Sequence, residues 1–143
     1  MHDNMTKQEK LLKVLLRLVG TSSLLATVAV VMPYEWMNFV HQSLGMGTLP
    51  KDPIVGYLAR SLSAFYAILG GLLWVLSFDL RRHRAVVRYL GWAILLFGLT
   101  LFAVDFLEHL PRFWAIWEGT IDAAIGVAIL LLSRQLPATP AQK

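Results

Sequence analysis

Five polar residues of a largely apolar chain have the types and spacing for ligand binding or proton transfer. Asp105 and His109 lie four residues apart, and Glu118 and Asp122 repeat that spacing further along the chain. Residues four apart share one face of a helix. Arg60 lies well upstream, early in another apolar stretch. Carboxylates and imidazoles act as acids and bases, and a guanidinium holds anionic or polar groups.

The composition is that of an integral membrane protein. Of the 143 residues, 57% are hydrophobic and only 15% are charged, whereas soluble domains carry about 25% charged residues. The absence of cysteine excludes disulfides, thiolate metal sites and thiol chemistry. The net charge of +4 is carried largely by residues that lie between the apolar segments. We therefore expect the charge to orient the chain in a lipid bilayer, and we expect no nucleic acid partner.

Four apolar segments are long enough to cross a bilayer, because a core of about 30 Å needs roughly 20 helical residues. The predicted helices span about Val14–Met32, Ile54–Phe78, Ala85–Leu107 and Phe113–Leu132. The prediction is all-α: residues 1–143 form a single integral membrane four-helix bundle. Residues 33–53 form the one sizeable linker outside the membrane. Aromatic and apolar residues there are spaced for one face of a short interfacial helix.

The distribution of Lys and Arg predicts the orientation. Ten of the thirteen basic residues fall on one side of the four predicted segments: around the start of the first, around the linker between the second and third, and after the fourth. The opposite side has only Lys51, Arg60 and Arg112. Four crossings with both termini cytoplasmic satisfy the rule at every loop. We expect a multi-pass protein of a cell membrane, specifically a bacterial inner membrane.

The five polar residues then fall in the outer half of the membrane. At 1.5 Å per residue, Asp105 lies near the outer interface and Asp122 near the midplane, while Arg60 and Glu118 lie at matching depths between them. A charged group near a helix centre costs about 2.5–3.5 kcal/mol. We therefore expect these side chains to face the bundle interior and to pair.

Alternative interpretations of single residues stay open. Arg60 is either an anchor for an anionic or polar ligand or half of a structural ion pair with Glu118 or Asp105. Asp122 either binds a proton or a ligand, or is a neutral acid hydrogen-bonded to a neighbouring helix. A metal site is not predicted, because di-iron bundles need Glu-x-x-His on paired helices, whereas here His109 directly follows a glutamate and no Glu-x-x-His occurs.

Three stretches carry a resemblance to a known group. They are "YLARSLSAFYAILGGLLWVLS", the basic linker "RRHR", and "PRFWAIWEG" at the start of the fourth segment. Over roughly 57–132 the chain resembles the small four-helix bacterial membrane proteins of the broad DoxX-like group. The resemblance implies a four-helix bundle with Arg60 and Glu118 as interior polar positions. It implies no particular activity or cofactor.

Three functions compete at this point. In the first, an outward-facing pocket between the helices binds a lipid, a quinone or another small apolar molecule. The polar end of that molecule is oriented by Arg60, Asp105, Glu118 and Asp122. In the second, the chain is a structural or assembly subunit bound to a membrane-protein partner. In the third, it is a membrane enzyme or proton-coupled carrier that uses Glu118 and Asp122 as acid and base. The first is favoured because the polar groups converge on one half of the bundle.

Overall fold

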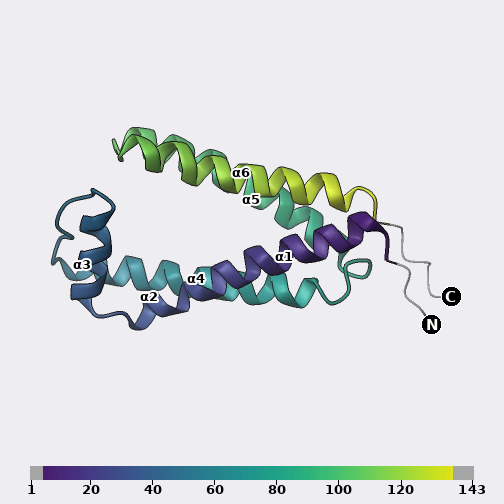
Figure 1. The fold of residues 1–143 in the computed structure, drawn as a ribbon, viewed down its shortest axis with the longest axis horizontal. Helices are drawn as coiled ribbons and strands as arrows, with labels where there is room; N and C mark the ends of the chain where they lie inside the picture. Colours follow the sequence, from purple (N-terminus) through teal and green to yellow (C-terminus); the bar gives the residue numbers. More distant parts are fainter. Residues whose placement is uncertain (1–4, 137–143) are drawn as a thin grey trace. The chain divides into compact units, whose positions relative to one another are not determined.

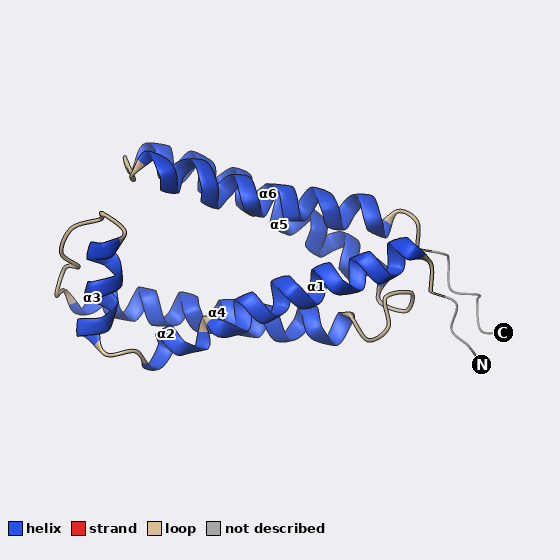
Figure 2. Cartoon of the chain, in the orientation of Figure 1, coloured by secondary structure: helices blue, strands red, loops and turns tan. Residues whose placement is uncertain are grey.

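The regular structure of the chain is helical. The computed structural model describes residues 5–136, and no strand occurs among them. The helices are α1 (Lys7–Leu25), α2 (Thr27–Val31), α3 (Tyr34–Ser43), α4 (Pro53–Leu76), α5 (Arg84–Leu107) and α6 (Arg112–Ser133) (Figure 1). Figure 2 shows that only loops and turns connect them. Four stretches are long and apolar enough to cross a membrane, namely Lys7–Val31, Pro53–Leu76, Arg84–Leu107 and Arg112–Ser133. The prediction of four long apolar helices is therefore confirmed.

The helix bounds follow the predicted ones except in the first apolar stretch, where a turn at Ala26 divides the predicted single helix into α1 and α2. The prediction placed one helix at Val14–Met32, whereas α1 begins at Lys7. The backbone N–H of Thr6 donates to Glu9 Oε2 at 2.7 Å, and the N–H of Glu9 donates to Thr6 Oγ1 at 3.2 Å. This reciprocal pair is a capping box, which satisfies two N–H groups that the first turn leaves free. The helix therefore starts at the cap and not at the first apolar run.

The described residues form two compact units, and the division falls within α1 and near the end of α4. Unit 1 contains the chain up to Arg17 and from Val75 onwards, and unit 2 contains Leu18–Trp74. Helices α5 and α6 thus belong to unit 1, and α2 and α3 to unit 2. The single four-helix bundle stays a prediction. The two chain ends, on which cytoplasmic termini depend, lie outside the described residues.

In unit 1, the helices α5 and α6 pack against each other along their length (Figure 1). Glycines let their backbones approach closely: a Cβ added to Gly119 would lie 2.6 Å from the Gly98 carbonyl oxygen and 2.6 Å from the Phe102 nitrogen. A Cβ on Gly91 would lie 3.0 Å from the Leu130 side chain. Small residues at helix contacts are the usual means of close packing in membranes, where apolar burial alone does not drive association.

An ion pair joins the start of α1 to the turn before α5, also within unit 1. Glu9 is only 1% exposed. Its carboxylate accepts from Arg81 Nε at 2.6 Å and from Arg81 Nη2 at 3.0 Å. Nearby, Arg17 Nε donates to the buried Ser77 hydroxyl at 3.1 Å. A fork of two charge-assisted hydrogen bonds fixes direction as well as distance, so the Glu9–Arg81 pair holds the start of α1 against the turn before α5.

Unit 2 contains a second close helix contact and the folded linker. A Cβ on Gly70 of α4 would lie 2.6 Å from the carbonyl oxygen of Gly20 in α1. Helix α3 occupies the linker where a short helix was predicted, and none of its residues is buried. The chain turns back after α3: Asn38 Oδ1 accepts the N–H of Leu49 at 2.8 Å. Gly47 has a φ of 78°, which an L side chain rarely adopts.

The glycine contact between α5 and α6 makes a direct prediction. Gly119→Leu forces a side chain into the backbone of α5, and overpacking of this kind costs about 1–3 kcal/mol. The midpoint of unfolding in detergent, followed by circular dichroism, should fall. Gly71→Ala is the control, because an added Cβ there meets nothing within 4 Å, and its midpoint should hold or rise. Equal midpoints for wild type and Gly119→Leu would show that the contact does not stabilise the helix pair.

Candidate functional site

Four of the five predicted polar residues belong to the α5–α6 pair of unit 1. Asp105 lies in the last turn of α5, and His109 follows in the connecting turn. Glu118 and Asp122 lie in the first half of α6. Arg60 lies in α4 and belongs to unit 2. The two units are each described by themselves, so the predicted pairing of Arg60 with the carboxylates stays a prediction.

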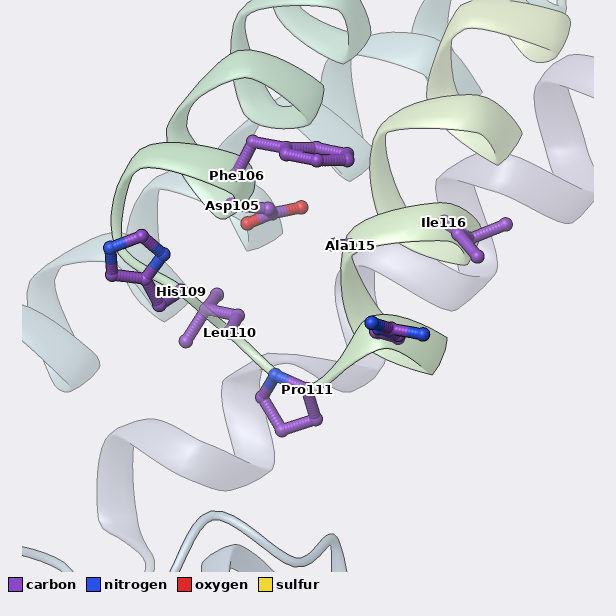
Figure 3. Close-up of a pocket in the computed structure, with 8 residues that line it drawn as sticks. Asp105, Phe106, His109, Leu110, Pro111, Ala115 and Ile116 are labelled. Atoms are coloured by element: carbon purple, nitrogen blue, oxygen red, sulfur yellow. The ribbon is translucent and has the colours of Figure 1, made fainter.

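Asp105 is a buried acid with an unsatisfied oxygen. Its exposure is 2%, and its Oδ2 has no hydrogen-bond partner within residues 5–136. Burying a polar group without a partner is costly, and the cost is larger for a carboxylate than for a neutral group. Figure 3 shows the carboxyl group directed from α5 toward α6. Because buried polar atoms are nearly always hydrogen-bonded, we expect a bound molecule to supply the donor that Asp105 Oδ2 lacks.

A cleft of about 590 Å³ opens beside Asp105. Its walls are mainly apolar and come from the end of α5, the connecting turn and the start of α6: Phe106, Leu110, Pro111, Ala115 and Ile116 (Figure 3). Its polar groups are Asp105, His109 and Arg112. This volume lies within the range of small-molecule sites, which combine apolar walls with a few placed polar groups.

His109 reaches this cleft through a strained backbone and not through helical spacing. Helix α5 ends at Leu107, and His109 has a φ of 55°. The N–H of Leu110 donates to the Asp105 carbonyl at 3.1 Å, which is the long bond of a Schellman cap with His109 at the left-handed position where glycine is usual. The predicted sharing of one helix face by Asp105 and His109 is therefore wrong. Figure 3 shows the imidazole turned away from α6.

Glu118 has a partner within its own helix. Its Oε2 accepts a hydrogen bond from the indole N–H of Trp114, one turn earlier. The carboxyl groups of Asp105 and Asp122 lie close enough for their charges to interact with that of Glu118. All three acids thus belong to the α5–α6 pair, and the predicted polar cluster that also includes Arg60 stays a prediction.

Asp122 and Arg60 complete the set. Asp122 is partly buried, and its carboxyl group makes no hydrogen bond within the described part of the chain. Arg60 is exposed, and its Nη2 donates to the carbonyl of Met32, just after α2, at 2.9 Å. In unit 2 the Arg60 guanidinium therefore caps the C-terminal end of α2.

The acids do not form a metal site within residues 5–136. No group of three or more His, Asp or Glu side chains there is close enough together to hold a metal ion. The cleft instead offers one buried acceptor and an apolar wall. A ligand with a hydroxyl or amine group at one end would satisfy Asp105 Oδ2 and cover the wall with its apolar body.

The sequence analysis did not single out two further groups, one in the cleft at Asp105 and one elsewhere in unit 1. Arg112 lines the cleft, and its position directly after Pro111 at a helix start is the signal that placed it there. The buried Glu9 pairs with Arg81, and the Thr-x-x-Glu pattern ahead of an apolar run is the signal for it.

The chain was compared with family models, with curated proteins and with solved structures, and none of them matches it. The geometry of the cleft is therefore the basis for any function.

The strain at His109 predicts how the turn responds to substitution. A left-handed backbone costs a non-glycine residue about 1–2 kcal/mol, so His109→Gly should unfold at the same temperature or up to a few degrees higher. His109→Val should lose stability, because a β-branched side chain is a true outlier at positive φ. Thermal unfolding in detergent checks both. A clear loss of stability in His109→Gly would show that the imidazole itself makes a stabilising contact.

Proposed function

We propose that the chain is a multi-pass membrane protein that binds a small, largely apolar ligand in the α5–α6 cleft. The four long apolar helices and the excess of Lys and Arg at the N-terminus and in the turn between α4 and α5 support four crossings with both termini cytoplasmic. In that orientation the turn between α5 and α6, with the cleft beside it, faces outward. Membership of the DoxX-like group stays a prediction.

The single observation that carries the ligand proposal is the orphaned oxygen of Asp105. It is buried, it is directed toward a cleft, and no described residue donates to it. A hydroxyl or amine at the end of a bound molecule would supply the missing hydrogen bond. The exchange of an unsatisfied acceptor for a satisfied one adds about 1–3 kcal/mol to binding.

The walls define the rest of the ligand. The side chains of Phe106 and Ile116 are more than half exposed in the free protein. A molecule that enters the cleft would cover part of this exposed apolar surface. The cleft lies near the ends of the helices, at the level of the headgroups in the proposed orientation. The ligand is therefore an amphipathic molecule, such as a lipid alcohol, a lipid amine or a quinol, that enters from the outer leaflet.

The proposed orientation can be tested with single cysteines, because the chain has none of its own. Thr48→Cys and Gln135→Cys place thiols at exposed positions in the linker and after α6. A membrane-impermeant maleimide added to intact cells should label Thr48→Cys, and should label Gln135→Cys only after permeabilisation. The reverse pattern, or labelling of both in intact cells, would overturn the orientation.

Asp105→Asn tests the ligand site. The probes are dodecylamine and dodecanol, with dodecane as the apolar control, added to the purified protein in short-chain detergent. The amine and the alcohol should raise the wild-type melting temperature more than dodecane does. Asp105→Asn should lose about tenfold in affinity for the amine, since the charge-assisted hydrogen bond is gone. The free variant should also melt higher than free wild type, because an unpaired buried carboxylate has been removed.

Asp122→Asn is the matched control, because it makes the same chemical change on the same helix pair and does not line the cleft. It should bind both probes as the wild type does. The ligand proposal fails if Asp105→Asn and Asp122→Asn lose affinity equally, or if dodecane stabilises the protein as much as the polar probes do.

A further inference from the structure

We infer that the opposite end of the α5–α6 pair holds a separate site for the headgroup of an anionic phospholipid. A small cavity of about 220 Å³ lies there, lined by Arg88, Trp92, Leu130 and Arg134. The lining belongs to unit 1 and contains two positive charges and no acid. This site shares no lining residue with the cleft at Asp105.

The order of the side chains along each helix matches the order of groups in a phospholipid. Arg88 and Trp92 lie four residues apart on α5, and Leu130 and Arg134 lie four apart at the end of α6. Residues four apart share a face and lie about 6 Å apart along the axis. Both arginines are near the helix ends, and both apolar residues lie one turn further toward the middle of the helices. A phosphate at the arginine level would therefore have its acyl chains at the level of Trp92 and Leu130.

The arginines remain able to bind an anion. Arg88 Nη2 makes one long hydrogen bond, 3.4 Å, to the carbonyl of Ser133. That bond holds the guanidinium beside the end of α6 and leaves most of its N–H groups available. Arg134 is exposed, and its side chain makes no hydrogen bond within residues 5–136. Guanidinium groups bind phosphate oxygens in a fork geometry, and basic pockets between membrane helices on the cytoplasmic side bind anionic headgroups.

A second basic cavity shows why the absence of acids matters. The cavity beside Glu9 also contains Lys13 and Arg81, but Glu9 and Asp79 line it as well. Its positive charges are balanced from within, and Arg81 is held by the Glu9 carboxylate at 2.6 Å. The Arg88–Arg134 cavity has no acid among its lining residues, so its two positive charges are not balanced by the side chains that form the cavity.

The size of the cavity limits what it takes. At about 220 Å³ it is smaller than the usual small-molecule site. It accommodates a headgroup, while the acyl chains would lie along the exposed apolar surface below. Trp92 is 55% exposed, and its amphipathic ring suits the boundary between headgroups and chains.

The test measures lipid binding to the purified full-length protein by native mass spectrometry. Palmitoyl-oleoyl phosphatidylglycerol and the matching phosphatidylcholine are titrated in separate arms, and soluble glycerol 3-phosphate forms a third arm. Phosphatidylglycerol should bind at least tenfold more tightly than phosphatidylcholine. Because each arginine near anionic lipid contributes about fivefold, Arg88→Gln combined with Arg134→Gln should weaken phosphatidylglycerol binding by tenfold or more.

Lys10→Gln combined with Arg82→Gln is the matched control. It removes two positive charges from exposed positions of unit 1 that lie on the same predicted side of the membrane and outside the cavity lining, and should change the affinity less than twofold. Arg134→Gln alone guards against misfolding, because it leaves the Arg88–Ser133 bond in place. It should weaken binding about fivefold. Circular dichroism verifies that each variant keeps its helix content.

Three results would overturn the inference. Equal loss in both double variants would mean that binding depends on net charge and not on this cavity. Equal affinity for the two lipids would mean that the headgroup charge is not read. Binding of glycerol 3-phosphate as tight as that of phosphatidylglycerol, and lost in the same variant, would mean that the ligand is a soluble phosphate ester.

Discussion

The close approach of α5 to α6 is the contact on which the rest of unit 1 depends. Gly98 and Gly119 bring the two backbones so near that even a methyl group would not fit between them. In lipid such contacts replace the hydrophobic drive that holds soluble helices together. The two candidate binding cavities lie at opposite ends of the pair: the Asp105 cleft at the turn, and the Arg88–Arg134 cavity at the other end. The positions of the residues that line each site therefore depend on the glycine contact between the two helices.

Two buried carboxylates show how differently the chain treats the same group. Glu9 is 1% exposed and accepts hydrogen bonds from Arg81 and from the backbone of Thr6. Asp105 is 2% exposed and has one oxygen with no partner in the described residues. The Glu9 carboxylate has hydrogen-bond partners for both oxygens. The Asp105 carboxyl group has a buried oxygen for which no described residue supplies a donor. Buried polar groups that break the general rule of satisfaction point to function more strongly than those that obey it.

The sequence predicted the helices better than it predicted their contacts. Hydropathy and length were enough for four long apolar helices, because lipid leaves the backbone few other choices. The start of α1 was placed late, since the apolar run begins at Val14 while the capping box begins at Thr6. The helical spacing of His109 was wrong, because α5 ends two residues before it and the backbone turns left-handed. Periodicity gives the residues on one face of a helix. It does not give the partner of that face, so Arg60 and Glu118 could be matched by depth but not by contact.

The two ends of the α5–α6 pair present different polar groups: an acid, a histidine and an arginine at the turn, and two arginines at the other end. In the proposed membrane orientation each end of the pair would lie where lipid gives way to water, and the polar groups found there differ between the ends. The Asp105 carboxyl group lies in the cleft at the turn, which Arg112 also lines, and two arginines lie beside Leu130 and Trp92 at the far end. An arginine with a long apolar stem can reach the surface and keep its charge in water. The short side chain of Asp105 cannot, so it remains buried and needs a partner that comes to it. This difference in reach supports the two proposals, a lipid headgroup at the arginines and a molecule that enters the cleft at Asp105.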